Sequence, residues 1–536
     1  CNYTGNGGIE SFAVVPQGAG FEIVDAHDFF KPIQATDMDF GYDGKVYVSD
    51  FVKLEWNGGG GWGRIYTLHD TESIKHASVK ETTERFRAGF TKLTAVELAA
   101  LLSHADMRMR LRAQYELAKR ATATPMDRAA LEALKSATQA SNSVLCRLHG
   151  IWGLGQIAAQ DATICAAVAN LLHDENEHVR GQAAKVLGDG AYQPAAAELI
   201  ALLTDTNPRV QFLAAMALGK LKSKSSLEPI IALLRSNADR DPLLRHAGVM
   251  ALLQLDDLDQ LLKYSSDPAP AVRMAVVLVL RRQADPRIAE FLNDEDPRIV
   301  TEAARAINDL PIDAAMPALA SLTNRYQLTP QSVPQPLLRR IINANFRGGK
   351  REHADALVAI VANERVEMSM RLEALAALKE WSQPGKRDCV TGFWRPTAAR
   401  SPEILQASVQ SGVTQMLTTA SGDLQTQLTE LIALVKVDID DQTIAAWTSD
   451  PQRPIAARVA ALRLLTARGS GSLPSAIEKA LADKDGRVRA AARQALARVN
   501  VDQAVKSIHD VLQSDAAPAI EKQLAIETVA AIGTPI

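Results

Sequence analysis

Carboxylates gather in a short segment near the start of the chain. Residues 36–50 read TDMDFGYDGKVYVSD, so acidic side chains alternate with apolar ones around an Asp-Gly pair. Carboxylate oxygens are ligands for hard cations such as Ca²⁺ and can also hold a polar substrate. Asp37 and Asp50 are therefore candidates to face a substrate or a cation. Asp beside a turn more commonly accepts backbone N–H bonds, which is the alternative.

A glycine-rich loop with tryptophans follows, and Arg64 stands just after it. The run Gly58–Gly63 (GGGGWG) is neither GxGxxG nor a P-loop, and it precedes an expected strand rather than a helix. No helix N-terminus would therefore receive a phosphate, and we expect no nucleotide site. Trp56 and Arg64 could line a sugar-binding rim, or they could hold the strands against the first helices.

A second unusual segment, residues 383–402, interrupts a helical pattern with Pro, Gly, aromatic and basic residues. Its candidate contact residues are Arg387, Asp388, Phe393, Trp394 and Arg395. Inserts in repeat arrays often carry contacts. The alternative is a loop that packs on its own helices through Phe393 and Trp394. A further span, 343–350, is expected to be a helix-ending loop.

The sequence contains no motif typical of a metal site or of a hydrolase. The ten histidines show no pair with the i, i+4 spacing of a helical metal site. The four cysteines form neither CxxC nor the CxxCH haem-attachment motif. No G-x-S-x-G or H-E-x-x-H motif occurs. We therefore expect no catalytic residue, metal site or cofactor in this chain.

Short strands would position the first group of residues. Met38 and Phe40 alternate before Asp43–Gly44, and Val46 and Val48 alternate after it, which predicts a tight hairpin. Residues 63–68 predict a third strand. A Gly-punctuated meander of this size is typical of a β-propeller blade. One small sheet is only marginally stable alone, so residues 1–70 are expected to end a larger propeller.

Helical repeats are expected from about residue 93. One phrase (an acidic or Pro turn, Val-Arg, Ala-Ala, Leu) recurs in five places: 174–188, 205–219, 267–280, 294–307 and 483–496. It resembles the HEAT-repeat signature, so the fold class is mostly α, a HEAT solenoid preceded by a partial propeller. The expected organisation is propeller 1–70, linker 71–92, repeats 93–382, insert 383–402 and repeats 403–536.

The recurring positions within the phrase have physical roles. The opening Asp is expected to cap the second helix, and Pro208 fits a first helical turn. An Arg-like position recurs in steps of roughly 28–38 residues. It could form a binding ladder. We favour instead a structural role in which each Arg pairs with the turn Asp of a neighbouring repeat.

Composition restricts the partners. The 536 residues carry a net charge of −3 with 23% charged residues, and no dense Lys/Arg run occurs. A nucleic-acid partner is therefore not expected. The longest apolar stretches fall far short of the roughly 20 residues of a membrane span. A protein partner is expected instead.

Together these segments resemble one family. The phrase at 36–50, the Gly-rich Trp loop, Gly63–Tyr66 (GRIY), Phe90–Leu98 (FTKLTAVEL), Arg147–Gly155 (RLHGIWGLG) and the insert's Asp388-x-Val-Thr-Gly with Arg395-Pro396 carry the resemblance. The family is the membrane-bound dehydrogenase or haem-binding propeller-HEAT proteins of planctomycete-type bacteria. Their propeller is similar to sorbosone and glucose dehydrogenases.

The resemblance implies more than this chain contains. The family order is signal, propeller, HEAT array and cytochrome c domain, and the chain matches only the last blade and the array. For the parent, the resemblance implies sugar or alcohol oxidation, haem c, a quinone cofactor or Ca²⁺, and a periplasmic or cell-envelope location. The missing propeller and cytochrome domains would then be the array's partners.

Two functions from different classes follow. The first is a fragment of an extracytoplasmic, haem-coupled dehydrogenase-like protein in which the HEAT array is docking arm and scaffold. The chain alone is expected to be inactive. The alternative is a non-enzymatic HEAT scaffold that binds a protein partner, with the insert as its contact.

Overall fold

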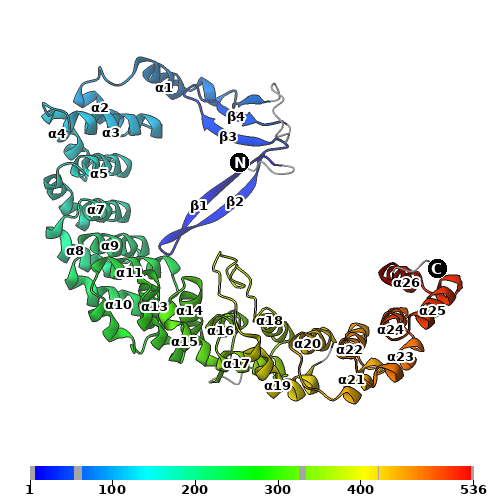
Figure 1. Ribbon diagram of the computed structural model, residues 1–536. Coiled ribbons are helices and arrows are strands. Elements are labelled where there is room, and N and C mark those ends of the chain that lie inside the picture. The colour runs from blue at the N-terminus through cyan, green and yellow to red at the C-terminus, as the bar shows by residue number, and fades with distance from the viewer. Residues whose placement is uncertain (1–6, 53–62, 325–332, 421, 533–536) are drawn as a thin grey trace. The chain divides into compact units, whose positions relative to one another are not determined.

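The computed structural model describes residues 7–52, 63–324, 333–420 and 422–532. The chain divides into two compact units, residues 1–279 and 280–536. Strands occupy the start of the first unit, and helices form the rest of both (Figure 1). Among the described residues, no helix combines the length and the apolar character needed to cross a membrane.

The strands of the first unit form two small antiparallel sheets. The five strands are β1 (Ile9–Gln17), β2 (Gly20–Phe30), β3 (Ala35–Phe40), β4 (Val46–Asp50) and β5 (Arg64–Leu68). One sheet has the order β1-β2 and the other β3-β4-β5. The predicted hairpin at Asp43–Gly44 and the third strand are confirmed. Gly44 has a φ of 78°, a conformation that glycine adopts without steric cost.

These sheets do not establish a propeller. The meander has three strands, whereas a propeller blade has four. The two sheets share a small core built on Ile9, Ala35 and Val48. The tip of the β1–β2 hairpin contacts the repeats, because Ala19 N donates to Asp241 Oδ2 at 2.7 Å and Arg209 donates to Ala19 O at 3.0 Å. The propeller assignment therefore stays a proposal.

Helices of the first unit begin in the span predicted as a linker, which contains α1. They are α1 (Ala77–Ala88), α2 (Ala95–Leu101), α3 (Met107–Ala121), α4 (Arg128–Ala137), α5 (Val144–Ala158), α6 (Ala166–Ala169), α7 (Glu177–Asp189), α8 (Ala196–Ala201), α9 (Pro208–Leu221), α10 (Leu227–Asn237), α11 (Pro242–Leu255) and α12 (Leu258–Leu261). Helix α13 (Pro270–Gln283) spans the boundary between the units.

Helices of the second unit are α14 (Pro297–Asp309), α15 (Met316–Ser321), α16 (Gln335–Gly348), α17 (Arg351–Ala362), α18 (Met368–Lys379), α19 (Pro402–Thr419), α20 (Gly422–Val435), α21 (Asp441–Thr448), α22 (Ile455–Arg468), α23 (Leu473–Leu481), α24 (Gly486–Val499), α25 (Val501–Gln513) and α26 (Ala519–Ile532). Short 3₁₀ helices occupy Ser73–Lys75, Ala162–Cys165, Asn170–His173, Gln193–Ala195, Leu202–Thr204, Lys224–Ser226, Leu262–Tyr264, Pro286–Asn293, Asp313–Ala315 and Leu322–Asn324.

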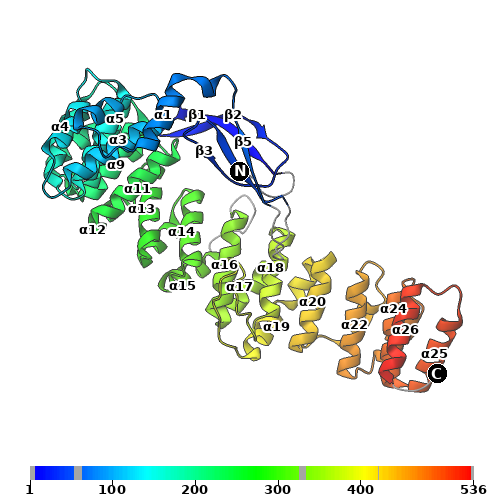
Figure 2. The ribbon, with the colours of Figure 1, turned by 90° about the horizontal axis from the view of Figure 1, so that it is seen from above.

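Within each unit the second helices of successive repeats pack side by side. In the first unit α5 packs on α7, α7 on α9 and α9 on α11. In the second unit α14, α16, α18, α20, α22 and α24 follow one another in the same way (Figure 2). Val179, Ala183, Ala184 and Leu187 of α7 are fully buried, as the repeat phrase predicts. Small and branched apolar residues thus fill the contact between helices.

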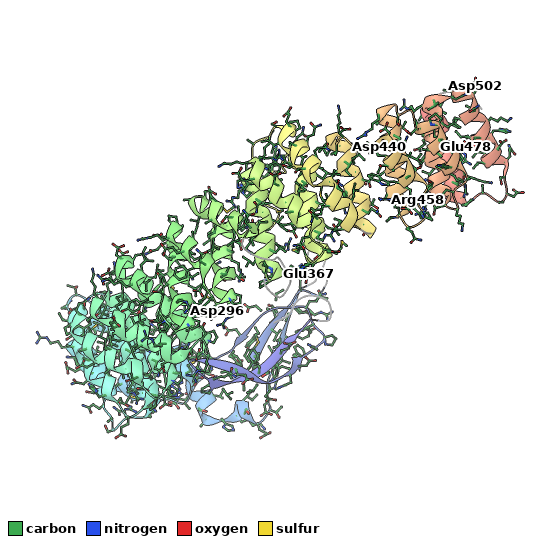
Figure 3. All side chains as sticks on the ribbon, turned by 90° about the horizontal axis from the view of Figure 1, so that it is seen from below. Asp296, Glu367, Asp440, Arg458, Glu478 and Asp502 are labelled. Atoms are coloured by element: carbon green, nitrogen blue, oxygen red, sulfur yellow. The ribbon has the colours of Figure 1, made fainter. Side chains whose placement is uncertain are left out.

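The capping prediction needs a correction. The cap of α7 is Asn176, whose side chain accepts from His178 N and Val179 N, and not the preceding Asp174. Asp296 and Asp440, labelled in Figure 3, likewise cap α14 and α21. Asp174 instead accepts from Asn176 N at 2.9 Å within the turn. Its second oxygen remains free to contact the neighbouring repeat.

That second oxygen receives the recurring arginine, and the pairing prediction is confirmed for part of the series. Arg147, Arg180 and Arg458 pair with a turn Asp of the next repeat, whereas Arg110 and Arg371 donate to backbone carbonyls instead. Arg147 Nη1 lies 2.5 Å from Asp174 Oδ2, and Arg180 donates to both oxygens of Asp205 at 2.8 and 3.1 Å. Arg458, labelled in Figure 3, pairs with Asp483 of the next turn. These guanidinium groups are largely buried, so they join repeats and offer no ladder for a ligand.

A buried histidine lies between α3 and α5. His149 Nε2 accepts from Arg110 Nε at 3.2 Å, and His149 Nδ1 lies 2.8 Å from Gln114 Oε1. The ring therefore carries its proton on Nδ1 and is neutral. Burial, together with the charge of Arg110, lowers the pKa of His149 from 6.5 to about 4. Protonation at mild acid is consequently easier in the unfolded chain.

We expect stability to fall as the pH drops below 6.5 toward 4, because the unfolded state takes up the proton first. At pH 5 the loss relative to pH 7.5 should be about 2 kcal/mol. Urea unfolding of the wild type and of His149→Gln at both pH values measures it. The variant should lack this part of the pH dependence, whereas equal pH dependence in both proteins would contradict the assignment.

Candidate functional site

The N-terminal candidates take structural positions. Asp50 is buried, and its Oδ1 accepts from Gln34 N and Val52 N, both at 3.0 Å. Asp37 Oδ1 accepts from Met38 N at 2.8 Å. Arg64 is the cross-strand neighbour of Asp50 and donates to Tyr66 Oη at 3.4 Å. Trp56 lies outside the described residues. The sheet thus brings Asp50 and Arg64 together. The carboxylates of Asp37 and Asp50 both accept backbone N–H bonds.

The described residues around Asp37 and Asp50 do not gather into a cation site. Among the described residues, no group of three or more His, Cys, Asp or Glu side chains is arranged to hold a metal. Asp50 accepts backbone N–H bonds from Gln34 and Val52, as the alternative describes, whereas Asp37 lies within β3 and accepts from the N–H of the next residue.

The insert between α18 and α19 folds into a small hairpin. Arg387 and Trp394 form an antiparallel bridge, Asp388 N donates to Phe393 O at 2.9 Å, and Gly392 N donates to Asp388 O at 2.8 Å. Gly392 closes the turn with a φ of 72°. We call residues 386–395 the recognition tip.

Asp388 holds the recognition tip in place. Its side chain is fully buried, and its Oδ1 accepts from Val390 N and Thr391 N, both at 3.0 Å. Its Oδ2 accepts from Asn343 Nδ2 at 2.9 Å and lies 3.5 Å from Arg395 Nη1. Burial alone would raise the pKa of Asp388, but the hydrogen bonds to the carboxylate outweigh it and lower the pKa. The group is a satisfied buried anion.

Arg395 fixes the other strand of the recognition tip. Its guanidinium donates to Asn308 O at 3.0 Å and to Asp313 Oδ1 at 2.9 Å. Asn343 also donates to Asn308 Oδ1 at 2.8 Å, so α14 and α16 share the same network. The polar base therefore joins the loop to two helices of the second unit.

The two aromatic side chains point away from this base. Phe393 is 67% exposed and Trp394 is 64% exposed. Lys386 Nζ lies 5.6 Å from the centre of the Trp394 ring. The alternative in which these aromatics pack on the loop's own helices is therefore wrong. Large apolar side chains held out in solvent by a fixed backbone are typical of an interaction surface.

Sequence reasoning missed part of this base. The span 343–350 was expected to be a loop, but α16 continues to Gly348, and Asn343 and Asn345 are buried helical residues. Asn is a poor helix former in solvent, which explains the error. The available signal was two amides beside the apolar run Ile341–Ile342, since buried amides need partners.

Comparisons with known proteins bear on the helical repeats. Residues 164–253 match the family model described as HEAT repeats. No curated protein matches the chain. Among solved structures, a homology model of the full-length AP-3 complex is 12% identical and covers 87% of this chain and 95% of its own, with a TM-score of 0.40. The Kap95p–RanGDP complex is 9% identical and covers 84% and 74%, with a TM-score of 0.37.

A third similar structure is the CpcE–CpcF phycocyanin lyase complex of Nostoc sp. PCC7120, 21% identical over 54% of this chain and 94% of that one, with a TM-score of 0.21. All three TM-scores lie below 0.5, so no argument is based on them. The repeats themselves are established by the family model and by the recurring helix pairs and arginine contacts.

Asp388→Ala should loosen the recognition tip, because it removes the acceptor of two backbone N–H groups and leaves two arginines without their carboxylate. We expect trypsin to cleave after Lys386 or Arg387 at least about tenfold faster than in the wild type. Asp388→Asn keeps an acceptor oxygen, so its rate of tryptic cleavage should lie between those of the wild type and Asp388→Ala. Glu364→Ala, an exposed acidic residue of the same unit, is the control. Unchanged cleavage of Asp388→Ala would contradict the anchoring role.

Proposed function

We propose that this protein is a HEAT-repeat scaffold that binds a protein partner through the recognition tip. The observation that carries the proposal is the exposure of Phe393 and Trp394 on a loop whose base is buried and hydrogen-bonded. Helical repeat arrays offer extended surfaces to partners, and this loop adds a protruding contact to such an array.

The energetics of the tip favour binding. Burying Phe393 and Trp394 in a partner removes a large apolar area from water, at about 25 cal/mol per Å². Aromatic residues dominate the binding energy of many interfaces. Because Asp388 and Arg395 already fix the backbone, little further ordering is needed when the partner binds.

Charge adds a preference to this contact. Lys386 and Arg387 are exposed on the tip, and Asp388, the one carboxylate of residues 386–395, is buried. The tip therefore presents two cations beside two aromatic rings. An acidic partner surface with an apolar hollow would be complementary to it.

Phe393→Ala combined with Trp394→Ala should abolish partner binding and leave the fold intact, because both rings lie in solvent. A photo-crosslinking residue at position 390, in lysate of the source cells, identifies the partner by mass spectrometry. The identified partner is then titrated against the wild type and the double variant. We expect at least about a hundredfold loss of affinity.

Tyr115→Ala with Met126→Ala is the matched control, because both residues are exposed and apolar but lie in the first unit. This control should bind as the wild type does. Equal affinity of the tip variant and the wild type for every crosslinked protein would refute the proposal. Circular dichroism must show the same helical signal for all three proteins.

A second candidate function is the dehydrogenase-like parent. One observation favours it: Phe12, Val14, Phe21 and Ile23 lie exposed on the β1–β2 hairpin, with Val14 opposite Ile23. An apolar sheet face of this kind is normally covered, and further propeller strands would cover it. The sugar or alcohol oxidation, haem c, quinone or Ca²⁺ and cell-envelope location of this proposal rest on the resemblance.

The reading frame on both sides of the chain tests this second candidate. If it is correct, a protein extended in both directions should contain upstream strands and a downstream CxxCH motif. That protein should show a haem c absorption spectrum and reduce a dye with an aldose, while the present chain alone should not. An extended protein with neither the spectrum nor the dye reduction would refute it.

A further inference from the structure

A cavity of about 670 Å³ lies beside the base of the recognition tip. Helix α15, the end of α16 and the start of α17 form its walls, together with Pro396–Ala398 of the insert. All of these elements belong to the second unit. The cavity therefore depends on the second unit alone.

Hydrogen-bond donors line one side of this cavity. Arg347 uses Nη1 to donate to Arg395 O at 3.1 Å, and its other N–H groups have no partner among the residues that the structure describes. His353 Nδ1 accepts from Lys350 N at 3.1 Å, so the ring proton lies on Nε2, and the ring also hydrogen-bonds with the backbone of Gly348. Lys350 is exposed at the rim.

Acidic residues nearby offset part of this positive charge. Asp313 Oδ1 is taken by Arg395, and Glu352 is exposed and lies 3.9 Å from Lys350 Nζ. Asp388 Oδ2 lies 3.8 Å from Arg347 Nη1, the same nitrogen that donates to Arg395 O, so Nε and Nη2 of Arg347 are left without an acceptor among the described residues. Arg400, stacked on Trp381 at 4.7 Å, adds a further positive charge behind Arg347. The cavity wall thus combines the cations Arg347 and Lys350 with the carboxylates Asp313 and Glu352, and the Nε and Nη2 of Arg347 are its donors that no described residue occupies.

Two further features restrict the ligand. The α17 N-terminus lies at the cavity through Lys350, Glu352 and His353, and the positive end of a helix favours a negative group. The opposite wall is apolar, with Met316, Ala344 and Ala356 among its residues. A ligand that fits both walls has an anionic oxygen end and a short aliphatic body.

We propose that this cavity binds an aliphatic carboxylate, with Arg347 as the donor to its oxygens. The carboxylate belongs either to a small free acid or to an Asp or Glu side chain of a bound partner. The two sources share one chemistry, because the same donors and the same apolar wall would receive both. The proposal does not depend on the aromatic contact of the recognition tip.

Two probes separate the sources. Saturation-transfer NMR with the full chain measures binding of butanoate, a free acid, and of N-acetylglutamate α-amide, which represents a protein side chain. We expect saturable binding of at least one, with a dissociation constant of about 1 mM or below. Tighter butanoate binding assigns the site to a free acid, and tighter binding of the glutamate derivative assigns it to a partner.

Three variants locate the binding. Arg347→Gln should weaken it about tenfold, because a charge-assisted hydrogen bond is lost. Ala356→Leu keeps every charge but fills the cavity, and should weaken binding similarly. Arg351→Gln removes the same charge four residues further along the chain, at the start of α17, where the side chain pairs with Asp355 outside the cavity, and should change nothing.

Three outcomes would overturn the proposal. The first is no binding of either probe at about 50 mM, well above the expected dissociation constant. The others are equal binding of butanamide and butanoate, and binding of inorganic phosphate in place of both probes. The tip variant Phe393→Ala with Trp394→Ala should still bind the carboxylate. Loss of partner binding and loss of carboxylate binding are therefore separable.

Discussion

The contact between a buried turn carboxylate and an arginine of the preceding repeat is the constraint that several junctions between repeats depend on. Asp174 accepts from an N–H of its own turn on Oδ1 and from Arg147 on Oδ2. Asp205 accepts from its own turn on Oδ1 and from Arg180 on both oxygens. A buried carboxylate that lost its arginine would be an uncompensated charge, which is strongly destabilising. At these junctions the pairing therefore fixes where one repeat docks on the next, while the apolar contacts of Val179 and Leu187 supply the burial.

The insert uses the same physical device for a different purpose. Asp388 is a buried carboxylate whose donors come from its own loop, from α16 and from Arg395. Satisfying that charge requires the hairpin to adopt one position on the helices. As a result, the aromatic residues beyond it are presented in a fixed direction, although they make few contacts with the rest of the unit. A binding surface is thus obtained from the burial of a charge rather than from the packing of the aromatics.

Local chemistry explains what the sequence could predict. The helix pairs, the Arg–Asp pairing and the Asp43–Gly44 hairpin follow from patterns within about 35 residues, and all are present. The position of Phe393 and Trp394 could not be predicted, because it depends on Asn308 and Asn343, which lie far away in sequence. The cap was assigned two residues too early because an Asp in a turn and an Asn at a helix start both accept N–H bonds. The roles of Asp37 and Asp50 stayed open for the same reason.

The burial of Asp388 determines the electrostatic field around the recognition tip. Because Asp388 is buried among its donors, the exposed charges of the tip are those of Lys386 and Arg387. The whole chain carries a net charge of −3, so this local positive field is a property of the tip and not of the protein. Exposed charges act within a Debye length, about 8 Å at physiological salt, so they guide only a partner that already approaches the tip. Burial of the aromatic rings then sets how tightly the partner is bound, since the free energy of apolar burial is insensitive to charge screening.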